Sequence, residues 1–388
     1  MNRPILEPVA CPPPRPTAHE LLVRRYPAPT APAAMPTPRQ AGPHRMTLQE
    51  IVGRRAAAEV ADRRLLRLHA IGDTGGLGNP GPQRAVAEAM ACELRGPDPA
   101  RRLFHLGDVV YPHGEPGGYP AQFDGGWAPY PAPIVGVPGN HDGECPPGPD
   151  GQPLHGFTRR FCSSGAASEP AARDPQTRPA QQQPHVHWSL RHELVTIIGV
   201  YSGVTDGGQI DEAQRRWLIG ELAAAPRDAV LLLAMHHPVY SADVVHGSNL
   251  ALGEVLDECF ARARRAPDAV LAGHAHNYQR FSRSLDERSV PYLVAGSGGF
   301  PELHALGRGI PDLPASFTGL PGVTLDAHQH SAFGFLTVTA QPGRTRIDYS
   351  LVVRRRSVRF DSVTVTAISG RRGLRGRSAP RWLPTPIR

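Results

Sequence analysis

The chain has 388 residues, of which 40% are apolar and 20% are charged, and its formal net charge is +7. Such a chain can bury a sizeable core, in one large domain or in two or three average ones. No apolar run approaches the roughly 18 residues of a transmembrane helix, and the proline-rich start does not have the apolar segment of a secretory signal. We therefore predict a cytoplasmic protein without a membrane partner and leave its oligomeric state open.

All 42 basic residues are arginines, and the positive charge is concentrated at the end of the chain. From Arg354 onward there are ten arginines and one aspartate, which gives +9 and leaves −2 of the total for everything before. This segment could contact the phosphates of a nucleic acid, or another acidic partner. We favour a solvated tail, because runs of like charge are commonly disordered ends.

The five cysteines are irregularly spaced. Cys145 and Cys162 could pair across one loop, but free thiols in a reducing compartment are the interpretation that we favour.

Changes in composition divide the chain into parts. Residues 1–45 are rich in Pro, Ala and Arg, which predicts a disordered arm. Residues 46–353 alternate strand-like and helix-like patterns, as one α/β domain does. Within it, the Pro-, Gly- and Gln-rich residues 143–183 predict an inserted surface loop. Residues 354–388 would form a terminal strand and the arginine-rich tail.

The patterning predicts elements along the whole domain. In chain order, helices are expected at 48–64, 83–94, around 210–218 and at 254–264, and strands at 65–71, 103–106, 134–137, 186–190, 194–200, 230–234 and 269–272. Three further strands, assigned to a second sheet, are expected at 292–295, 334–339 and 346–352.

Polar clusters follow five of the strand-like runs. They are Gly72-Asp73-Thr74-Gly75, Gly107-Asp108-Val109-Val110-Tyr111, Gly139-Asn140-His141-Asp142, Met235-His236-His237-Pro238 and Gly273-His274-Ala275-His276. Taken alone, each is weak evidence, since Asp73 could cap a helix and the histidines could be satisfied structural residues. Taken together, carboxylate, amide and imidazole donors at strand ends are typical of a site for two hard metal ions.

The ordered set resembles the calcineurin-like metallophosphoesterase superfamily. Its first motif usually reads Asp-x-His, but Gly75 stands at the third position here, and Tyr111 lies three residues after Asp108. This substitution resembles the purple acid phosphatase branch, in which a tyrosine replaces the missing histidine as a ligand. The resemblance covers about residues 65–300. It implies an α/β fold, a β-sandwich of two mixed sheets flanked by helices, with the metal site at the C-terminal ends of strands.

By position, the resemblance also implies the ligands. The first metal ion would take Asp73, Asp108, Tyr111 and His276, and the second would take the shared Asp108 with Asn140, His236 and His274. His236 is preferred to His237 because the family pattern is His-x-Pro, but an exchange of the two stays open. A metal-free scaffold is disfavoured, since every expected ligand is present.

Other residues receive roles around this centre. His141 would contact the phosphate or protonate the leaving oxygen, and Asp142 would orient its imidazole. A surface pair of these two residues is the alternative. For Arg280 we favour a structural ion pair over a substrate clamp. No family motif includes His185 and His187, and both are interpreted as structural.

The implied function is hydrolysis of a small phosphoester by a binuclear metal centre. A metal-activated hydroxide would attack phosphorus in line, and His141 would assist the leaving group. A tyrosine ligand favours Fe(III), paired with divalent Fe, Zn or Mn. Monoesters, diesters, nucleotides and phosphoproteins remain open as substrates, and a phosphodiesterase or nucleotide hydrolase of the same superfamily is an alternative. A second alternative function is binding, in which the basic tail would contact a nucleic acid or an acidic partner.

Overall fold

The computed structural model describes residues 35–36, 42–144, 153–162, 182–203, 208–285, 288–307, 313–317 and 320–368. Most of the predicted arm, most of the predicted inserted loop and the arginine-rich tail after residue 368 therefore lie outside the described residues, as does Cys145. Of the described cysteines, Cys92 and Cys259 are free thiols. In the part of the chain that the structure describes, no helix is long and apolar enough to span a bilayer.

The larger of two mixed sheets has nine strands, and its centre is parallel. Strands β6 (Val195–Gly199), β7 (Val230–Ala234), β8 (Ala269–Ala272) and β10 (Arg288–Ala295) run side by side in one direction. The strands around them complete the order β1-β5-β6-β7-β8-β10-β9-β12-β11, with β1 at Arg45–Thr47, β5 at Trp188–Arg191, β9 at Tyr278–Leu285, β12 at Val323–Gln329 and β11 at Ala315–Ser316.

The smaller sheet has six strands in the order β15-β14-β13-β2-β3-β4. Strands β2 (Leu66–Ile71), β3 (Leu103–His105) and β4 (Ile134–Gly136) are parallel, whereas β13 (Gly334–Gln341), β14 (Arg344–Val353) and β15 (Arg356–Thr366) are joined antiparallel. Residues 354–388 were predicted as a terminal strand and a tail. β15 lies at the start of this region, so residues 356–366 belong to the sheet.

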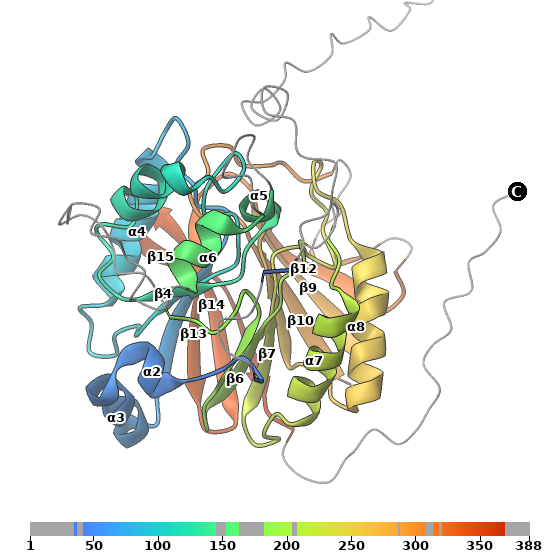
Figure 1. The fold of residues 1–388 in the computed structure, drawn as a ribbon. Coiled ribbons are helices and arrows are strands. Elements are labelled where there is room, and N and C mark those ends of the chain that lie inside the picture. Colours follow the sequence, from blue (N-terminus) through green and yellow to red (C-terminus); the bar gives the residue numbers. More distant parts are fainter. Residues whose placement is uncertain are drawn as a thin grey trace, which may run out of the picture.

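Helices cover the outer faces of the two sheets, which gives four layers (Figure 1). Helices α7 (Glu212–Ala223) and α8 (Leu250–Ala263) pack on the larger sheet, and α4 (Gly81–Glu93), η2 (Pro120–Gly125) and α6 (His155–Phe161) pack on the smaller one. Along β7, Val230, Leu232 and Ala234 face the core between the sheets, and Leu231 and Leu233 face α7 and α8. Both faces are buried, so the strand is a continuous apolar run.

The predicted fold class is confirmed, but two predictions about its elements were wrong. Residues 292–295 belong to β10, which pairs with β8 in the larger sheet and not with 334–339 and 346–352 in the smaller one. The helix predicted at 48–64 is two helices, α2 (Leu48–Val52) and α3 (Arg54–Arg63). The chain breaks between them at Gly53, whose φ of 83° lies outside the helical region that a continuous helix requires.

The predicted inserted loop contains a helix in its described part. In α6, Phe157 and Phe161 are fully buried and stack on each other with ring centroids 4.4 Å apart. They pack with Phe123 of η2 and the apolar face of α4. The prediction of a surface loop is therefore wrong for residues 155–161, because phenylalanines spaced four apart form an apolar helix face that needs a core.

Candidate metal centre

The five polar clusters lie at one edge of the sandwich, where β2, β3, β4, β7 and β8 end. α5 (Asn140–Gly143) begins directly after the β4 loop. Asp73, Asp108 and His274 each adopt a left-handed backbone conformation, with φ of 59°, 57° and 73°. This conformation is costly for residues other than glycine and is concentrated at functional sites. It turns the chain sharply at the strand end, so that each side chain faces the neighbouring loops.

Hydrogen bonds join the loops of the two sheets. Asp73 Oδ2 of the smaller sheet accepts the His274 N–H of the larger one at 2.8 Å, and His236 Nδ1 lies 2.9 Å from the Leu106 carbonyl oxygen. Gly139 allows the closest approach, because a Cβ there would collide with the Asp108 carboxylate. The loops are thereby held as one unit.

The predicted ligands of the first metal ion lie together. The Tyr111 hydroxyl is 3.2 Å from Asp108 Oδ2 and 3.4 Å from His276 Nε2. His276 Nε2 is in turn 3.6 Å from Asp73 Oδ1. Ligand atoms bonded to one ion at about 2.1 Å and at right angles are about 3.0 Å apart. The four side chains are therefore close to the spacing that one ion requires.

The predicted ligands of the second metal ion are equally close. His236 Nε2 lies 3.0 Å from Asn140 Oδ1, 3.2 Å from His274 Nδ1 and 3.3 Å from Asp108 Oδ2. One ligand atom each of Asp108, His236 and His274 lies within 4.8 Å of the other two. Of the seven predicted ligands, Asn140 and His274 are the two that are not fully buried, so this side of the group faces solvent.

Two of the histidines are oriented through their second ring nitrogen. His236 Nδ1 faces the Leu106 carbonyl oxygen, and His276 Nδ1 lies 3.1 Å from the Glu302 carbonyl oxygen. A carbonyl oxygen only accepts, so both Nδ1 atoms carry a proton and both Nε2 atoms are directed into the group. This is the usual arrangement of metal-binding histidines.

The electrostatics of the group favour a cation. Asp73 Oδ1 is buried and has no hydrogen-bond partner among the described residues, and burial raises the pKa of Asp73 well above its ordinary value. Burial also opposes a charge on His236, yet the Asp108 carboxylate outweighs it and raises the pKa of His236 to about 9. A buried carboxylate oxygen without a donor and a field that attracts positive charge fit metal ions at this position.

His237 lies beside this group but faces a different partner. The residue is buried, with 2% of its surface exposed. Its Nδ1 is 2.9 Å from the Ser202 hydroxyl, which also accepts the His237 N–H at 3.1 Å. His236 contacts Asn140 and Asp108, whereas the ring of His237 packs against His274 with centroids 4.5 Å apart.

The predicted partner of His141 is corrected by the structure. Asp142 accepts N–H groups from Val109, Val110 and Gly139, so its carboxylate fastens the Asp108 loop to the Asn140 loop. His141 Nδ1 instead lies 2.6 Å from the Pro112 carbonyl oxygen and 3.6 Å from the Glu144 carboxylate. Burial disfavours its charge, but Asp108 and Glu144 together raise the pKa of His141 to about 9. The imidazole therefore holds a proton at neutral pH.

Three residues at the site were not predicted from the sequence. Glu144 is paired with His113 and His141. His246 packs on His274 with ring centroids 4.0 Å apart, and His304 stacks on His276 at 4.2 Å. None of the three lies in a polar cluster that follows a strand-like run, which is the sequence pattern by which the other site residues were identified. The prediction for Arg280 is confirmed, because it forms ion pairs with Asp326 and Asp361.

Comparisons with known proteins agree with this geometry. The family description "Calcineurin-like phosphoesterase" matches residues 66–278, more than half of the chain. The chain belongs to the calcineurin-like phosphoesterase family. It is 33% identical over 110 residues to purple acid phosphatase 21 of Arabidopsis thaliana and 30% identical over 110 residues to purple acid phosphatase 22 of the same plant. Each match covers 26% of this chain and 25% of the relative, so the chain spans about a quarter of those proteins' length.

Solved structures share the fold of this family member. The purple acid phosphatase PPD1 from yellow lupin (Lupinus luteus) seeds superposes with a TM-score of 0.56 at 18% identity, over 78% of this chain and 54% of that one. GAP50, the anchor in the inner membrane complex of Plasmodium, superposes with a TM-score of 0.54 at 10% identity, over 78% and 89%. The predicted likeness to the purple acid phosphatase branch is confirmed by the two plant relatives.

Proposed function

We propose that this chain hydrolyses phosphate esters with two metal ions bound at the edge of the sandwich. The main support is that the seven predicted ligand side chains, Asp108 included, come from five loops and lie close together. A purely structural cluster would not need this composition, because one carboxylate oxygen has no hydrogen-bond donor and two imidazole Nε2 atoms are directed into the same group. Family membership supports the same conclusion.

The proposal has two ligand sets, which the distances support. Asp73, Asp108, Tyr111 and His276 would hold one ion, and Asp108, Asn140, His236 and His274 would hold the other. Asp108 is placed in both sets because its Oδ2 lies near a member of each, 3.2 Å from the Tyr111 hydroxyl and 3.3 Å from His236 Nε2. Its Oδ1 accepts the His141 N–H at 3.0 Å. When bound, the ions neutralise the phosphoryl oxygens and lower the pKa of a coordinated water.

Two residues of the chain would complete the chemistry. His141 keeps a proton near neutral pH and can give it to the leaving alkoxide. Its imidazole is fixed by Pro112 and Glu144, so the proton donor does not need to be reoriented during the reaction. Asp142 keeps the Asp108 and Asn140 loops together.

The first ion is proposed to be Fe(III), and the second a divalent Fe, Zn or Mn ion. The support is the Tyr111 hydroxyl, because burial and then the neighbouring carboxylates raise its pKa well above its ordinary value. A highly charged ion is the partner that would stabilise the phenolate there. Such a centre absorbs visible light. Small phosphoesters are the proposed substrates, and they would approach on the side of Asn140 and His274, the two ligands that are only partly buried.

The test is metal analysis of the purified chain together with a panel of phosphomonoesters, phosphodiesters and nucleotides from about pH 5 to about pH 9. We expect two ions per chain and metal-dependent turnover. Asp108→Ala should lose both ions and lower kcat/KM at least about a thousandfold, because one carboxylate serves both ions. Glu258→Ala, an exposed change on α8, is the matched control and should behave as the wild type.

Retention of both ions and of hydrolysis by Asp108→Ala would refute the ligand sets. A chain that binds two ions but hydrolyses none of the panel would refute the proposed activity and leave the metal centre standing.

A further inference from the structure

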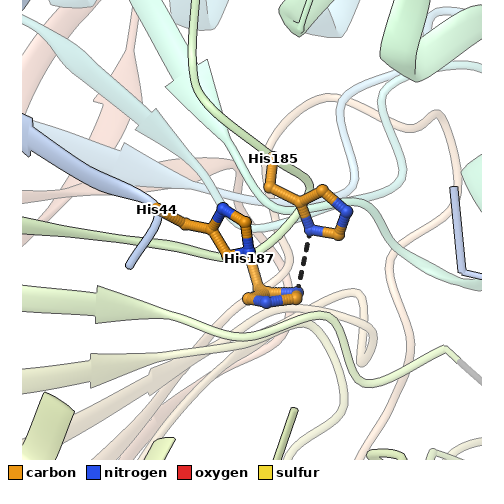
Figure 2. A group of neighbouring side chains, drawn as sticks. All are labelled: His44, His185 and His187. Atoms are coloured by element: carbon orange, nitrogen blue, oxygen red, sulfur yellow. Dashed lines mark hydrogen bonds between the residues drawn. The ribbon is translucent and has the colours of Figure 1, made fainter. Parts of the chain in front are cut away.

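A second group of histidines forms at the edge of the larger sheet. His44 directly precedes β1, and His185 and His187 come just before β5 (Figure 2). These residues are far apart in the chain, and their rings meet because β1 pairs with β5 in parallel. One ring nitrogen of each lies within 4.8 Å of the other two. The group shares no residue with the candidate metal centre.

In this group one ring nitrogen keeps a lone pair and another has no hydrogen-bond partner among the described residues. His185 Nε2 lies 2.9 Å from the Pro36 carbonyl oxygen, which only accepts, so Nε2 carries the proton and Nδ1 keeps a lone pair. That Nδ1 is 3.0 Å from His187 Nδ1. His44 Nδ1 is buried without a hydrogen-bond partner among the described residues. An imidazole held by a carbonyl through one nitrogen is prepared to bind a metal through the other.

The surroundings keep the rings uncharged and in place. Burial is the largest cause that lowers the pKa of His44 and of His185, and it lowers that of His187 to about 2. The Trp217 ring packs over His187 with centroids 4.6 Å apart. Metal ions bind the neutral form of imidazole, so no proton has to be displaced from a charged ring.

The support under the rings is rigid. Glu221 of α7 accepts hydrogen bonds from Arg45, Ser189 and Arg191, which ties β1 and β5 to the helix. The Ser189 N–H also donates to the His44 carbonyl oxygen at 3.0 Å. The negative charge of Glu221 favours a positive charge at His44, and that of Asp211 favours one at His185. These two carboxylates would therefore offset the charge of a bound cation.

We propose that His44, His185 and His187 bind one divalent transition-metal ion of the zinc type, with solvent as the fourth ligand. The 3.0 Å between the facing nitrogens is close to the roughly 3.3 Å between ligands bonded at about 2.0 Å in a tetrahedral site. Three neutral nitrogen donors suit zinc and its neighbours better than magnesium or calcium, which prefer oxygen.

The consequence is structural. β1 has three residues and sits at the edge of its sheet, so few backbone hydrogen bonds hold it. An ion bound by His44 on one side and by His185 and His187 on the other would fasten β1 to β5. The binding free energy would then add to the stability of this part of the fold.

The experiment uses the full chain without a polyhistidine tag, stripped with a chelator and titrated with Zn²⁺. We compare the wild type, His187→Ala, and His330→Ala, which removes an exposed histidine elsewhere. Bound zinc is counted after dialysis, and the melting temperature is followed. We expect His187→Ala to bind one ion fewer than the wild type, with hydrolysis kept. The zinc-dependent rise in Tm, roughly 3–5 °C at a hundredfold excess over Kd, should be reduced in this variant alone.

A second variant separates this site from the candidate metal centre. Asp108→Ala combined with His236→Ala should still bind one zinc ion, and adding His187→Ala should abolish that binding. Equal zinc counts in the wild type and His187→Ala would overturn the proposal, whatever the fate of the double variant. A folded double variant without zinc would overturn it as well. Neither outcome bears on the proposed hydrolysis.

Discussion

The chemistry at the sheet edge depends on which atom each side chain presents. Asp108 directs Oδ2 toward Tyr111, while the His141 N–H binds its Oδ1. His236 and His276 direct Nε2 into the group because a backbone carbonyl oxygen holds Nδ1. These orientations come from residues that are not ligands themselves. Leu106 and Glu302 contribute only their carbonyl oxygens, and Asp142 contributes by binding backbone N–H groups. Changes at the ligands and at their supports should therefore have different signatures.

His141→Ala should separate metal binding from turnover. The residue lies against the Tyr111 ring, with centroids 4.5 Å apart, and is not in either proposed ligand set. We expect both ions to be retained, while kcat falls about 10²- to 10⁴-fold, the usual contribution of a general acid. Metal analysis and steady-state kinetics on the same preparation measure both quantities. Loss of an ion from this variant would make His141 a ligand.

His236→Ala and His237→Ala decide between the neighbouring histidines. His236 contacts Asn140 and Asp108, whereas the Nδ1 of His237 is bound to Ser202. We expect His236→Ala to lose at least one ion, and His237→Ala to keep both. Because His237 is buried, its replacement should cost about 1–3 kcal/mol of stability, since the Ser202 hydroxyl loses its hydrogen bond to the imidazole and keeps only the one from the His237 N–H. Metal content and thermal melting distinguish the two effects, and the reverse pattern would exchange the assignments.

At the scale of elements, the site is made by the ends of parallel strands. β2, β3 and β4 of one sheet and β7 and β8 of the other end at the same edge. The strands are buried and rigid, so the loops that follow them begin from fixed positions. The part of the predicted insertion that forms α6 supports the β3 and β4 loops from outside, because its phenylalanines pack with η2.

Phe157→Ala tests the importance of α6. Its side chain is fully buried and stacked on Phe161. Replacement should lower the free energy of unfolding by about 3–5 kcal/mol, since a large cavity is left in a packed core. Chemical denaturation measures the change, and Arg159→Ala, an exposed position on the same helix, should alter stability by less than about 0.5 kcal/mol. A similar effect of both changes would mean that α6 is not part of the core.

At the scale of the whole molecule, Glu93 joins segments that are distant in the chain. At the end of α4, its carboxylate accepts hydrogen bonds from Arg67 and His69 of β2, from Thr337 of β13 and from Ser357 of β15. Burial opposes the ionisation of Glu93. The hydrogen bonds from His69 and Ser357 and the positive charge of Arg67 outweigh burial, and the pKa of Glu93 falls to about 2. Burial keeps the His69 ring neutral, so the imidazole acts as a donor and the charge comes from Arg67.

This carboxylate predicts an acid-dependent stability. The pKa of Glu93 in the folded chain lies below its ordinary value of 4.5. Its contribution is therefore complete above about pH 4.5 and is lost as the pH falls toward 2, with an upper bound of about 3 kcal/mol. Glu93→Gln should destabilise the chain at neutral pH and flatten this acid-dependent loss. Denaturation at several pH values tests it, with Glu258→Gln, an exposed carboxylate on α8, as the control. An unchanged pH dependence in Glu93→Gln would contradict the prediction.

The sequence alone determined the strands that carry the site and the residues that meet there. β7 and β8 coincide with their predicted spans, because a strand buried on both faces is an apolar run bounded by polar residues. Asp73, Asp108 and His274 were identifiable because a glycine precedes each of them at the end of such a run.

Only the tertiary structure decided what contacts these elements make. Residues 292–295 have a strand pattern in either sheet, and their pairing with β8 depends on long-range packing that no local pattern contains. Asp142 follows His141 in the chain, yet it binds backbone N–H groups of two loops. His44 meets His185 and His187 through strand pairing. Local patterns set burial and strand formation, whereas contacts between distant residues are fixed only when the sheets pack together.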